Sequence, residues 1–358
     1  MTERMNFLVF GAGAIGTYIG GSLARMGHRV IFLEQSKVSA ELQKRGLRVD
    51  LGSVQYSLTS DQYLLSFTAS LDEACQHAHF DFAIFALKSF DTAPLLQSLI
   101  THHSSLLSHP SSLPPLLCLS NGVDNEPTLA ATLGADKVIA GTVTSSIGRR
   151  AAGDIVLERL RGVGVADGHP LSGKLAAALD EAGLNVRIYP HAADMKWSKM
   201  LTNLLANATA AILDMAPTEV FTNPRLFTLE MRMLRETLAV MKAHGIRVVD
   251  LPGTPVRALA FASKFPAFIA RPILTKAVGG GRGGKMPSFH IDLHSGRGQS
   301  EVDWLNGAVV RYGEKVGVPT PINKVLNDTL MALTRGEIPT ANFSRKPKEL
   351  LALVSKSN

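Results

Sequence analysis

The sequence has little cysteine, few aromatic side chains and no long apolar run. Only Cys75 and Cys118 occur in 358 residues, and neither has a second thiol at metal-ligand or redox spacing. We therefore expect no disulfide framework and no metal site, and we favour a reducing, cytoplasmic compartment. The first apolar run, NFLVF, ends at Gly11 and is too short for a signal peptide or a membrane span. These absences favour a soluble protein.

Basic side chains are unevenly distributed along the chain. The net charge is +7, but residues 191–358 alone carry +9, whereas residues 1–190 carry −2. Residues 251–291 contain six Lys or Arg and no acid. No group of basic and aromatic side chains forms a recognisable nucleic-acid module. We therefore expect no nucleic-acid partner, and we interpret the charge as a field that attracts small anions.

One segment, FASKFPAFIARPILTKAV at residues 261–278, is both apolar and basic. Its prolines interrupt any long amphipathic helix, so we do not expect it to bind a membrane surface. We expect instead a face of the second domain or a subunit contact, which leaves a homodimer as one assembly. Five glycines then fall within Gly279–Gly284, where we expect a loop that is mobile or approaches a ligand.

Short β-branched or aromatic runs alternate with helical periods through the first half of the chain. The runs are NFLVFG, HRVIFLE, FDFAIFALK, LLCLSNG, KVIAGTVTSS, GDIVLERL, RGVGVADG and NVRIYP. Strands that alternate with helices predict an α/β fold around a parallel sheet. Beyond about residue 191 the apolar spacing becomes helical. We expect a first domain at 1–190, a mainly α-helical domain at 191–345 and a flexible tail at 346–358.

The first predicted strand ends in a glycine motif that opens a helix. Its residues are Gly11, Ala12, Gly13, Ala14, Ile15 and Gly16, in the pattern G-x-G-x-x-G. Gly11 allows the tight turn, Gly13 lets the backbone approach phosphates, and Gly16 lets helix and strand pack closely. The motif predicts a Rossmann-type domain whose helix N-terminus binds the pyrophosphate of a dinucleotide.

Glu34 lies 23 residues beyond Gly11, at the end of the second predicted strand. An acid at this position accepts hydrogen bonds from the ribose hydroxyls and repels a 2′-phosphate, which favours NAD(H). Arg29 and Lys37 are expected to flank the same strand end as Glu34, and either would meet a 2′-phosphate if the loop folds back. The residues alone leave NAD(H) and NADP(H) both open.

Two polar clusters in the second half are candidates for chemistry. Lys199, Asn203 and Asn207 are spaced i, i+4 and i+8, so they share one side of a predicted helix. Asn is costly inside a helix, which suggests a polar role, although a solvated flank has the same pattern. Further along, Ser300 and Asp303 predict a capping box with Glu301 in the first turn, where an acid also complements the helix dipole.

These motifs occur together in an order that resembles one enzyme family, the 2-dehydropantoate 2-reductases, also called ketopantoate reductases. The shared features are the glycine motif, Lys88 at the end of FDFAIFALK, the turn Ser120-Asn121-Gly122, W-x-K-x-x-x-N-x-x-x-N, and S-x-x-x-D…G-R…E-x-D-x-x-N-G. The resemblance covers nearly the whole chain. It implies NADP(H)-dependent reduction of a small anionic 2-keto acid, 2-dehydropantoate, to pantoate in pantothenate and coenzyme A biosynthesis.

The resemblance also implies a role for individual residues. Lys199 would be the catalytic acid that stabilises and protonates the alkoxide left by hydride transfer, with Glu301 as its partner at the substrate. Substrate contacts would come from Asn203, Asn207 and Ser288. Asn121 would lie near the nicotinamide, and Lys88 near cofactor and substrate.

The sequence departs from the family pattern in three places. Glu34-Gln35 follow the second strand where an Arg for the NADP 2′-phosphate is common. Three residues before Ser288, this chain has Lys285 where an Asn substrate contact is more familiar. Lys285 would instead bind a carboxylate of the substrate. One extra residue separates Gly296-Arg297 from Glu301. These departures are compatible with a related reductase of another 2-oxo acid or an opine-type substrate. A non-catalytic dinucleotide sensor predicts a broken Lys or Glu position, and both are present.

Overall fold

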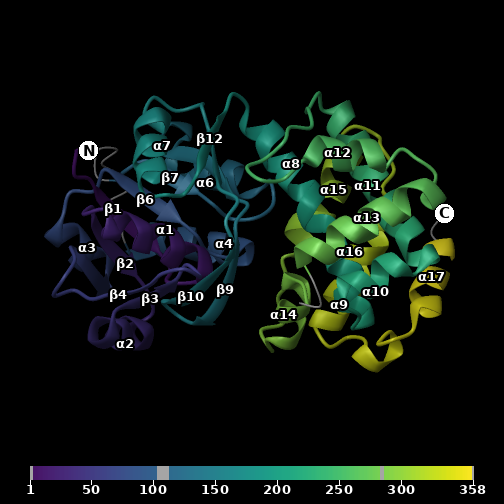
Figure 1. Cartoon of the computed structure of the whole chain (residues 1–358), viewed down its shortest axis with the longest axis horizontal. Helices are drawn as coiled ribbons and strands as arrows, with labels where there is room; N and C mark the ends of the chain where they lie inside the picture. Colours follow the sequence, from purple (N-terminus) through teal and green to yellow (C-terminus); the bar gives the residue numbers. More distant parts are fainter. Residues whose placement is uncertain (1–2, 103–112, 283–285, 357–358) are drawn as a thin grey trace. The chain divides into compact units, whose positions relative to one another are not determined.

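The computed structural model describes residues 3–102, 113–282 and 286–356, and the chain divides into two compact units (Figure 1). Unit 1 comprises Met1–Ser120, Asn125–Lys196 and Leu251–Thr254. Unit 2 comprises Asn121–Asp124, Trp197–Asp250 and Pro255–Asn358. The principal boundary therefore lies between residues 196 and 197, inside a helix, and not at residue 190. Two short segments, Asn121–Asp124 and Leu251–Thr254, belong to a different unit from the residues on either side of them in the sequence.

Unit 1 is built on an eight-stranded sheet with the order β12-β11-β8-β7-β6-β1-β2-β5. The strands are β1 (Asn6–Phe10), β2 (Arg29–Leu33), β5 (Leu65–Thr68), β6 (Phe82–Phe85), β7 (Leu116–Cys118), β8 (Val138–Val143), β11 (Val163–Ala166) and β12 (Val186–Tyr189). Six neighbouring strands pair in parallel, in the order β8-β7-β6-β1-β2-β5. Strand β11 is antiparallel to β8 and parallel to β12. The predicted α/β class with a mainly parallel N-terminal sheet is confirmed.

A second sheet of four short strands has the order β4-β3-β10-β9. Its strands are β3 (Leu47–Asp50), β4 (Gln55–Leu58), β9 (Ser146–Ala151) and β10 (Asp154–Arg159). The sequence analysis identified β10 but did not identify β9 or three short strands, β3, β4 and the edge strand β5. These three have four residues each and mix polar with apolar side chains, so they lack the apolar run that marks a buried parallel strand.

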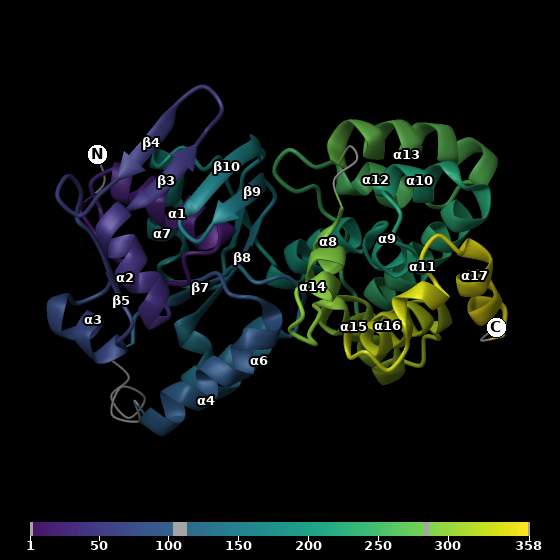
Figure 2. The ribbon, with the colours of Figure 1, turned by 90° about the horizontal axis from the view of Figure 1, so that it is seen from below.

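Helices cover both faces of the large sheet, because its inner strands bury side chains on both faces. The helices are α1 (Ala14–Arg25), α2 (Ser36–Arg45), α3 (Leu71–His77), α4 (Thr92–His102), α6 (Asn125–Leu133) and α7 (Ser172–Glu181). Along β1, Phe7 and Val9 pack in one core with α1 and α7, whereas Leu8 and Phe10 pack in another with α4 and α6. Figure 2 shows α4 and α6 side by side, as their direct contacts require.

Unit 2 is helical throughout its described part. Its helices are α8 (Ala192–Leu204), which begins in unit 1, α9 (Asn207–Leu213), α10 (Pro217–Thr222), α11 (Pro224–Ala243), α12 (Val256–Ala262), α13 (Ala267–Arg282), α14 (Ser288–His294), α15 (Val302–Lys315), α16 (Pro321–Thr334) and α17 (Pro347–Lys356). The long helix α11 packs against α10, α13, α15, α16 and α17. No helix in the described ranges is long and apolar enough to cross a membrane.

Two expectations for unit 2 differ from the structure. The expected loop at Gly279–Gly284 is wrong in its first part, because α13 continues to Arg282; residues 283–285 lie outside the described residues. Glycine costs about 1 kcal/mol per residue in a helix but does not forbid one, and Ala270 and Leu274 anchor α13 in the core. The expected flexible tail at 346–358 is helical over α17, because Leu350 and Val354 form a buried face against α11 and α16.

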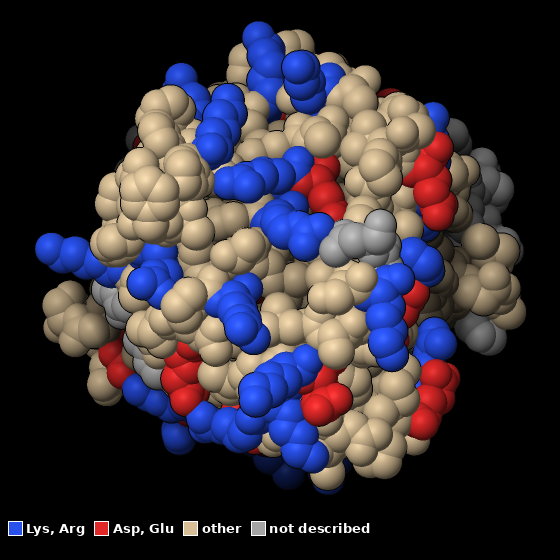
Figure 3. Space-filling view, turned by 90° about the vertical axis from the view of Figure 1, so that its right-hand side faces the viewer, with Lys and Arg blue, Asp and Glu red and all other residues tan. Residues whose placement is uncertain are grey.

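The charge excess of the second half is visible on one face of unit 2. In Figure 3, Lys and Arg side chains outnumber Asp and Glu side chains across this face. Exposed basic residues of α13 and α17 and of the turn before α17 include Lys276, Arg345, Lys346 and Lys348. Part of the excess positive charge of the second half is therefore exposed on this face of unit 2.

Candidate functional site

The glycine motif forms the turn between β1 and α1. Gly11 has φ +91°, a conformation that side chains rarely adopt, and its N–H donates to the carbonyl of Leu33 at 3.0 Å. A Cβ on Gly16 would lie 1.9 Å from the carbonyl oxygen of Gly11, so helix and turn are in direct contact there. A Cβ on Gly13 would meet nothing within 4 Å. Gly11 and Gly16 are thus required by the fold itself, whereas Gly13 is not.

The N-terminus of α1 is free of side-chain caps and acids. Gly13 is the N-cap residue, no side chain accepts a hydrogen bond there, and the first turn holds no Asp or Glu. The first amides of a helix have no intrahelical acceptor, and the helix dipole adds partial positive charge. The segment Gly13–Gly16 therefore fits a phosphate group, because the first turn itself holds no acid.

Glu34 lies directly against the glycine turn. Its Oε1 accepts a hydrogen bond from the Ala12 amide at 2.5 Å, and its Oε2 accepts one from the Gln35 amide at 3.1 Å. The carboxylate is thus fixed beside the motif. Arg29 begins β2, at the opposite end of the strand from Glu34, so the expectation that it flanks the same strand end is wrong. Lys37 is exposed in the first turn of α2.

Lys88 lies at the same edge of the sheet as the glycine turn. It follows the carboxyl end of β6, which pairs in parallel with β1 so that Phe85 is opposite Phe10. Lys88 is half-buried and is the N-cap residue of a 3₁₀ turn at Ser89–Asp91. Ligands of open α/β sheets bind beyond the carboxyl ends of the strands, so this is a position from which a side chain reaches a bound ligand.

The predicted polar stripe is divided between two helices. Lys199 and Asn203 lie on α8, both half-buried, but Asn207 begins α9. Between them Ala206 has φ +50°, and the buried carboxylate of Glu230 accepts its amide at 2.7 Å. The prediction of one continuous helix is wrong. The Ala206 amide donates to the side chain of Glu230, a residue of α11, and not to a backbone carbonyl of the helix. Glu230 also accepts the hydroxyl of Thr209 at 2.5 Å.

Four predicted site residues are joined by hydrogen bonds in unit 2. The amide nitrogen of Asn203 donates to the Asn121 amide oxygen at 3.0 Å. The amide nitrogen of Asn207 lies 3.0 Å from the Asn203 carbonyl and 3.3 Å from the Ser288 hydroxyl. The Asn207 amide oxygen accepts the Phe289 amide at 3.1 Å. Three segments far apart in sequence therefore present amides and a hydroxyl together.

Glu301 is buried, with 1% of its surface exposed, and is the N-cap residue of α15. Its amide donates to Asp292 of α14 at 3.3 Å. The structure does not contain the expected Ser300–Asp303 capping box in this part of the described chain. The Ser300 hydroxyl instead accepts a hydrogen bond from the amide of Val302, two residues later, at 3.3 Å. Asp303 instead pairs at 3.2 Å with Arg311, which lies eight residues further along α15.

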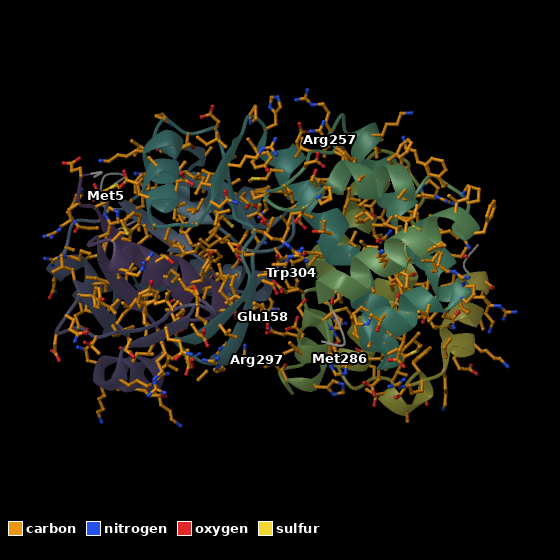
Figure 4. The ribbon with its side chains drawn as sticks, in the orientation of Figure 1. Met5, Glu158, Arg257, Met286, Arg297 and Trp304 are labelled. Carbon is orange, nitrogen blue, oxygen red and sulfur yellow. The ribbon has the colours of Figure 1, made fainter. Side chains whose placement is uncertain are left out.

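The turn that carries Asn121 is held against α15. Gly122 has φ +85°, and a Cβ there would lie 2.7 Å from the carbonyl oxygen of Trp304, a residue labelled in Figure 4. Asp124, two residues later, pairs with Arg311 at 2.7 Å. The sequence analysis did not identify Asp124 or Arg311, because ion pairs between distant segments leave no local pattern. Asp292 was part of the motif S-x-x-x-D, but no role was predicted for it. Lys285 lies outside the described residues.

Comparison with known proteins connects both units to one family. The family model "Ketopantoate reductase PanE/ApbA" matches residues 7–167, and "Ketopantoate reductase PanE/ApbA C terminal" matches residues 192–334. A 2-dehydropantoate 2-reductase of Archaeoglobus fulgidus is 26% identical over 333 residues, which cover 92% of this chain and 96% of that protein. One from Pyrococcus horikoshii is 24% identical over 90% of this chain and 95% of its own length.

Solved structures share the fold over almost the whole chain. A PanE/ApbA family ketopantoate reductase from Ralstonia eutropha JMP134 has a TM-score of 0.75 and 24% identity, covering 93% of this chain and 99% of its own. A D-mandelate dehydrogenase in complex with NADH and anilino(oxo)acetate has a TM-score of 0.73 and 21% identity, with the same coverage.

Proposed function

Because the chain belongs to the ketopantoate reductase PanE/ApbA family, we propose that it reduces 2-dehydropantoate to pantoate with a nicotinamide dinucleotide as hydride donor. The resemblance expected from the motifs is confirmed at the level of the family. The relatives and structural neighbours are oxidoreductases that act on a CH–OH group, and the chain is an enzyme of that class. The identity of the keto acid and the choice of dinucleotide are the proposed parts.

The observation that carries the proposal is the hydrogen-bonded array of Asn121, Asn203, Asn207 and Ser288 beside Lys199. Lys199 is one helical turn before Asn203 on α8, so both project from the same side of the helix. Uncharged donors and acceptors with fixed partners orient a substrate that carries a carboxylate, a ketone and a hydroxyl. A lysine among them supplies the positive charge and the proton that ketone reduction requires.

In the proposed reaction, the bound dinucleotide supplies the hydride that adds to the keto carbon. The ketone oxygen then carries the electron pair of the former C=O π bond as an alkoxide. The ammonium of Lys199 stabilises this charge, donates a proton to the oxygen, and regains a proton from water afterwards. Glu301 accepts the substrate hydroxyl and keeps the Lys199 ammonium oriented. Asn203, Asn207 and Ser288 hold the rest of the acid.

The glycine turn of unit 1 fits the dinucleotide, and its details favour NADH. The amides of Gly13–Gly16 would bind the pyrophosphate, and Lys88 at the same sheet edge would contact cofactor and substrate. The Glu34 carboxylate, fixed by the Ala12 amide, would accept the ribose hydroxyls and repel a 2′-phosphate. We therefore propose a preference for NADH over NADPH, although the family resemblance alone points to NADP(H).

Glu34→Gln tests the cofactor preference. The glutamine retains an oxygen that accepts the Ala12 amide but has no charge, so the turn keeps its hydrogen bond while the repulsion of a 2′-phosphate is lost. We expect the ratio of kcat/KM for NADH to that for NADPH to fall by about tenfold. Asp61→Asn, which removes an exposed carboxylate elsewhere in unit 1, is the control and should leave the ratio unchanged. An unchanged ratio in Glu34→Gln would show that Glu34 does not select the cofactor.

Initial rates with a panel of 2-oxo acids test the substrate. We expect kcat/KM for 2-dehydropantoate to exceed that for benzoylformate and for simple branched 2-oxo acids by at least about tenfold, because only 2-dehydropantoate offers a hydroxyl to the site. The second candidate is another 2-oxo acid, favoured by the structural likeness to D-mandelate dehydrogenase and by an acid at position 34. Turnover of benzoylformate without turnover of 2-dehydropantoate would establish it. Absence of turnover with both cofactors would reject 2-dehydropantoate.

A further inference from the structure

Two imidazoles and a carboxylate meet where α9 ends against α14, outside the residues assigned to substrate and dinucleotide. Asp214 is the C-cap residue of α9, and His290 and His294 lie on α14. One potential metal-binding atom from each residue lies within 4.8 Å of the other two. The Nε2 atom of His290 is 2.9 Å from Asp214 Oδ1, and the two imidazole rings are 4.3 Å apart between centroids.

The local structure aims all three side chains at one point. His290 and His294 are separated by one helical turn, which places both rings on the same side of α14, as in helical zinc sites. Asp214 has φ +49°, which ends α9, and its second oxygen accepts the Ser344 hydroxyl at 3.4 Å. A hydrogen bond to the ligand carboxylate from a neighbouring residue is a common support of metal sites. The three ligands therefore come from two elements, α14 and the C-terminal end of α9, that are in direct contact.

We propose that Asp214, His290 and His294 bind a divalent transition-metal ion of the zinc class. Neutral imidazole and carboxylate are ligands for such ions, with metal–ligand bonds of about 2.0–2.2 Å. A tetrahedral ion holds its ligand atoms about 3.3 Å apart, so side-chain shifts of about 1 Å suffice. About half of the Asp214 side chain is exposed, which leaves the fourth position to water. The scarcity of cysteine excludes thiolate sites but not this one.

The surrounding charges permit a cation. The hydrogen bond from His290 holds the pKa of the Asp214 carboxyl below its usual range, so the carboxylate is ionised at neutral pH. Arg345 also acts electrostatically on Asp214, but its guanidinium is paired with Glu219. A bound metal ion would fasten the C-terminal end of α9 to α14, and would therefore stabilise the folded chain by mass action.

Calorimetric titration of the untagged full-length protein with ZnCl₂ at pH 7.5 tests the site. We expect one Zn²⁺ per chain and a rise in melting temperature with Zn²⁺ concentration, and no comparable response to MgCl₂, because Mg²⁺ prefers oxygen ligands. His294→Ala and Asp214→Asn should each weaken Zn²⁺ binding at least about tenfold. His79→Ala, an exposed histidine of unit 1, should bind Zn²⁺ like the wild type.

The alternative is a His–Asp hydrogen bond with no metal function, and the experiment separates the two. The circular dichroism of His294→Ala should match the wild type, because the side chain is exposed. The proposal is overturned if His294→Ala and Asp214→Asn, folded by that criterion, bind Zn²⁺ as tightly as the wild type or if no protein binds it.

Discussion

Lys199→Met is expected to lower kcat by about 10²–10⁴-fold, the usual contribution of a positioned general acid, and to leave dinucleotide affinity within about twofold of the wild type. Methionine keeps an unbranched side chain in the half-buried position but has no charge and no proton. The glycine turn at Gly11–Gly16, which we propose binds the pyrophosphate, belongs to unit 1, whereas Lys199 belongs to unit 2. Stopped-flow turnover and NADH fluorescence titration measure the two quantities separately.

The matched control for this prediction is Lys242→Met, which removes an exposed lysine near the end of α11. It should retain wild-type kcat and thermal stability. If Lys199→Met loses turnover and dinucleotide binding together, Lys199 supports the fold or the cofactor and is not the acid. If Lys199→Met retains turnover, another group protonates the alkoxide.

Two glycine substitutions, Gly13→Ala and Gly16→Ala, are expected to change different properties of the protein, dinucleotide binding in the first and stability in the second. Gly13 has φ −69°, and an added Cβ meets no protein atom within 4 Å, so Gly13→Ala should fold and melt like the wild type. Its methyl group would occupy the space where the backbone approaches the pyrophosphate, so NADH binding should weaken by about 10²-fold or more. Calorimetry of NADH binding and thermal melting of the free protein measure both effects.

Gly16→Ala should instead destabilise the protein without any ligand. Its Cβ would lie 1.9 Å from the carbonyl oxygen of Gly11, a backbone atom that cannot rotate away. Overpacking of this kind costs about 1–3 kcal/mol, so the melting temperature should fall by several degrees. A Gly13→Ala protein that binds NADH normally would mean that the turn does not hold the pyrophosphate. A Gly16→Ala protein of unchanged stability would mean that helix and turn separate easily.

The sequence predicted the elements whose signal is local. The strand before Gly11, the helix that follows the glycine motif and the strand in FDFAIFALK all have short-range patterns of apolar residues and glycine. The break between Asn203 and Asn207 has no such pattern, because its cause is Glu230 on another helix. Likewise, LLALV in α17 becomes a buried face only when α11 and α16 are present to cover it.

The candidate site was predicted as residue types and not as an arrangement. The spacing of Lys199 and Asn203 follows from helical geometry, but the bond from Asn203 to Asn121 joins positions 82 residues apart. Only the motif resemblance connected Asn121 and Ser288 to this site before the fold was known. The role of Asp292 beneath Glu301, and of Arg311 beside Asp124, depends on helix packing that periodicity does not specify.

The two short segments that belong to the other unit decide how this protein can be divided. A fragment cut at residue 190 would lack Leu251–Thr254, where the carbonyl of Pro252 accepts the hydroxyl of Thr144 at 2.8 Å. The remaining fragment would lack Asn121, the partner of Asn203, and Asp124, the partner of Arg311. Neither half of the gene therefore encodes a complete unit. A chimaera that exchanges the dinucleotide-binding half with a relative must transfer residues 251–254 and keep residues 121–124, or each product will contain a mismatched patch.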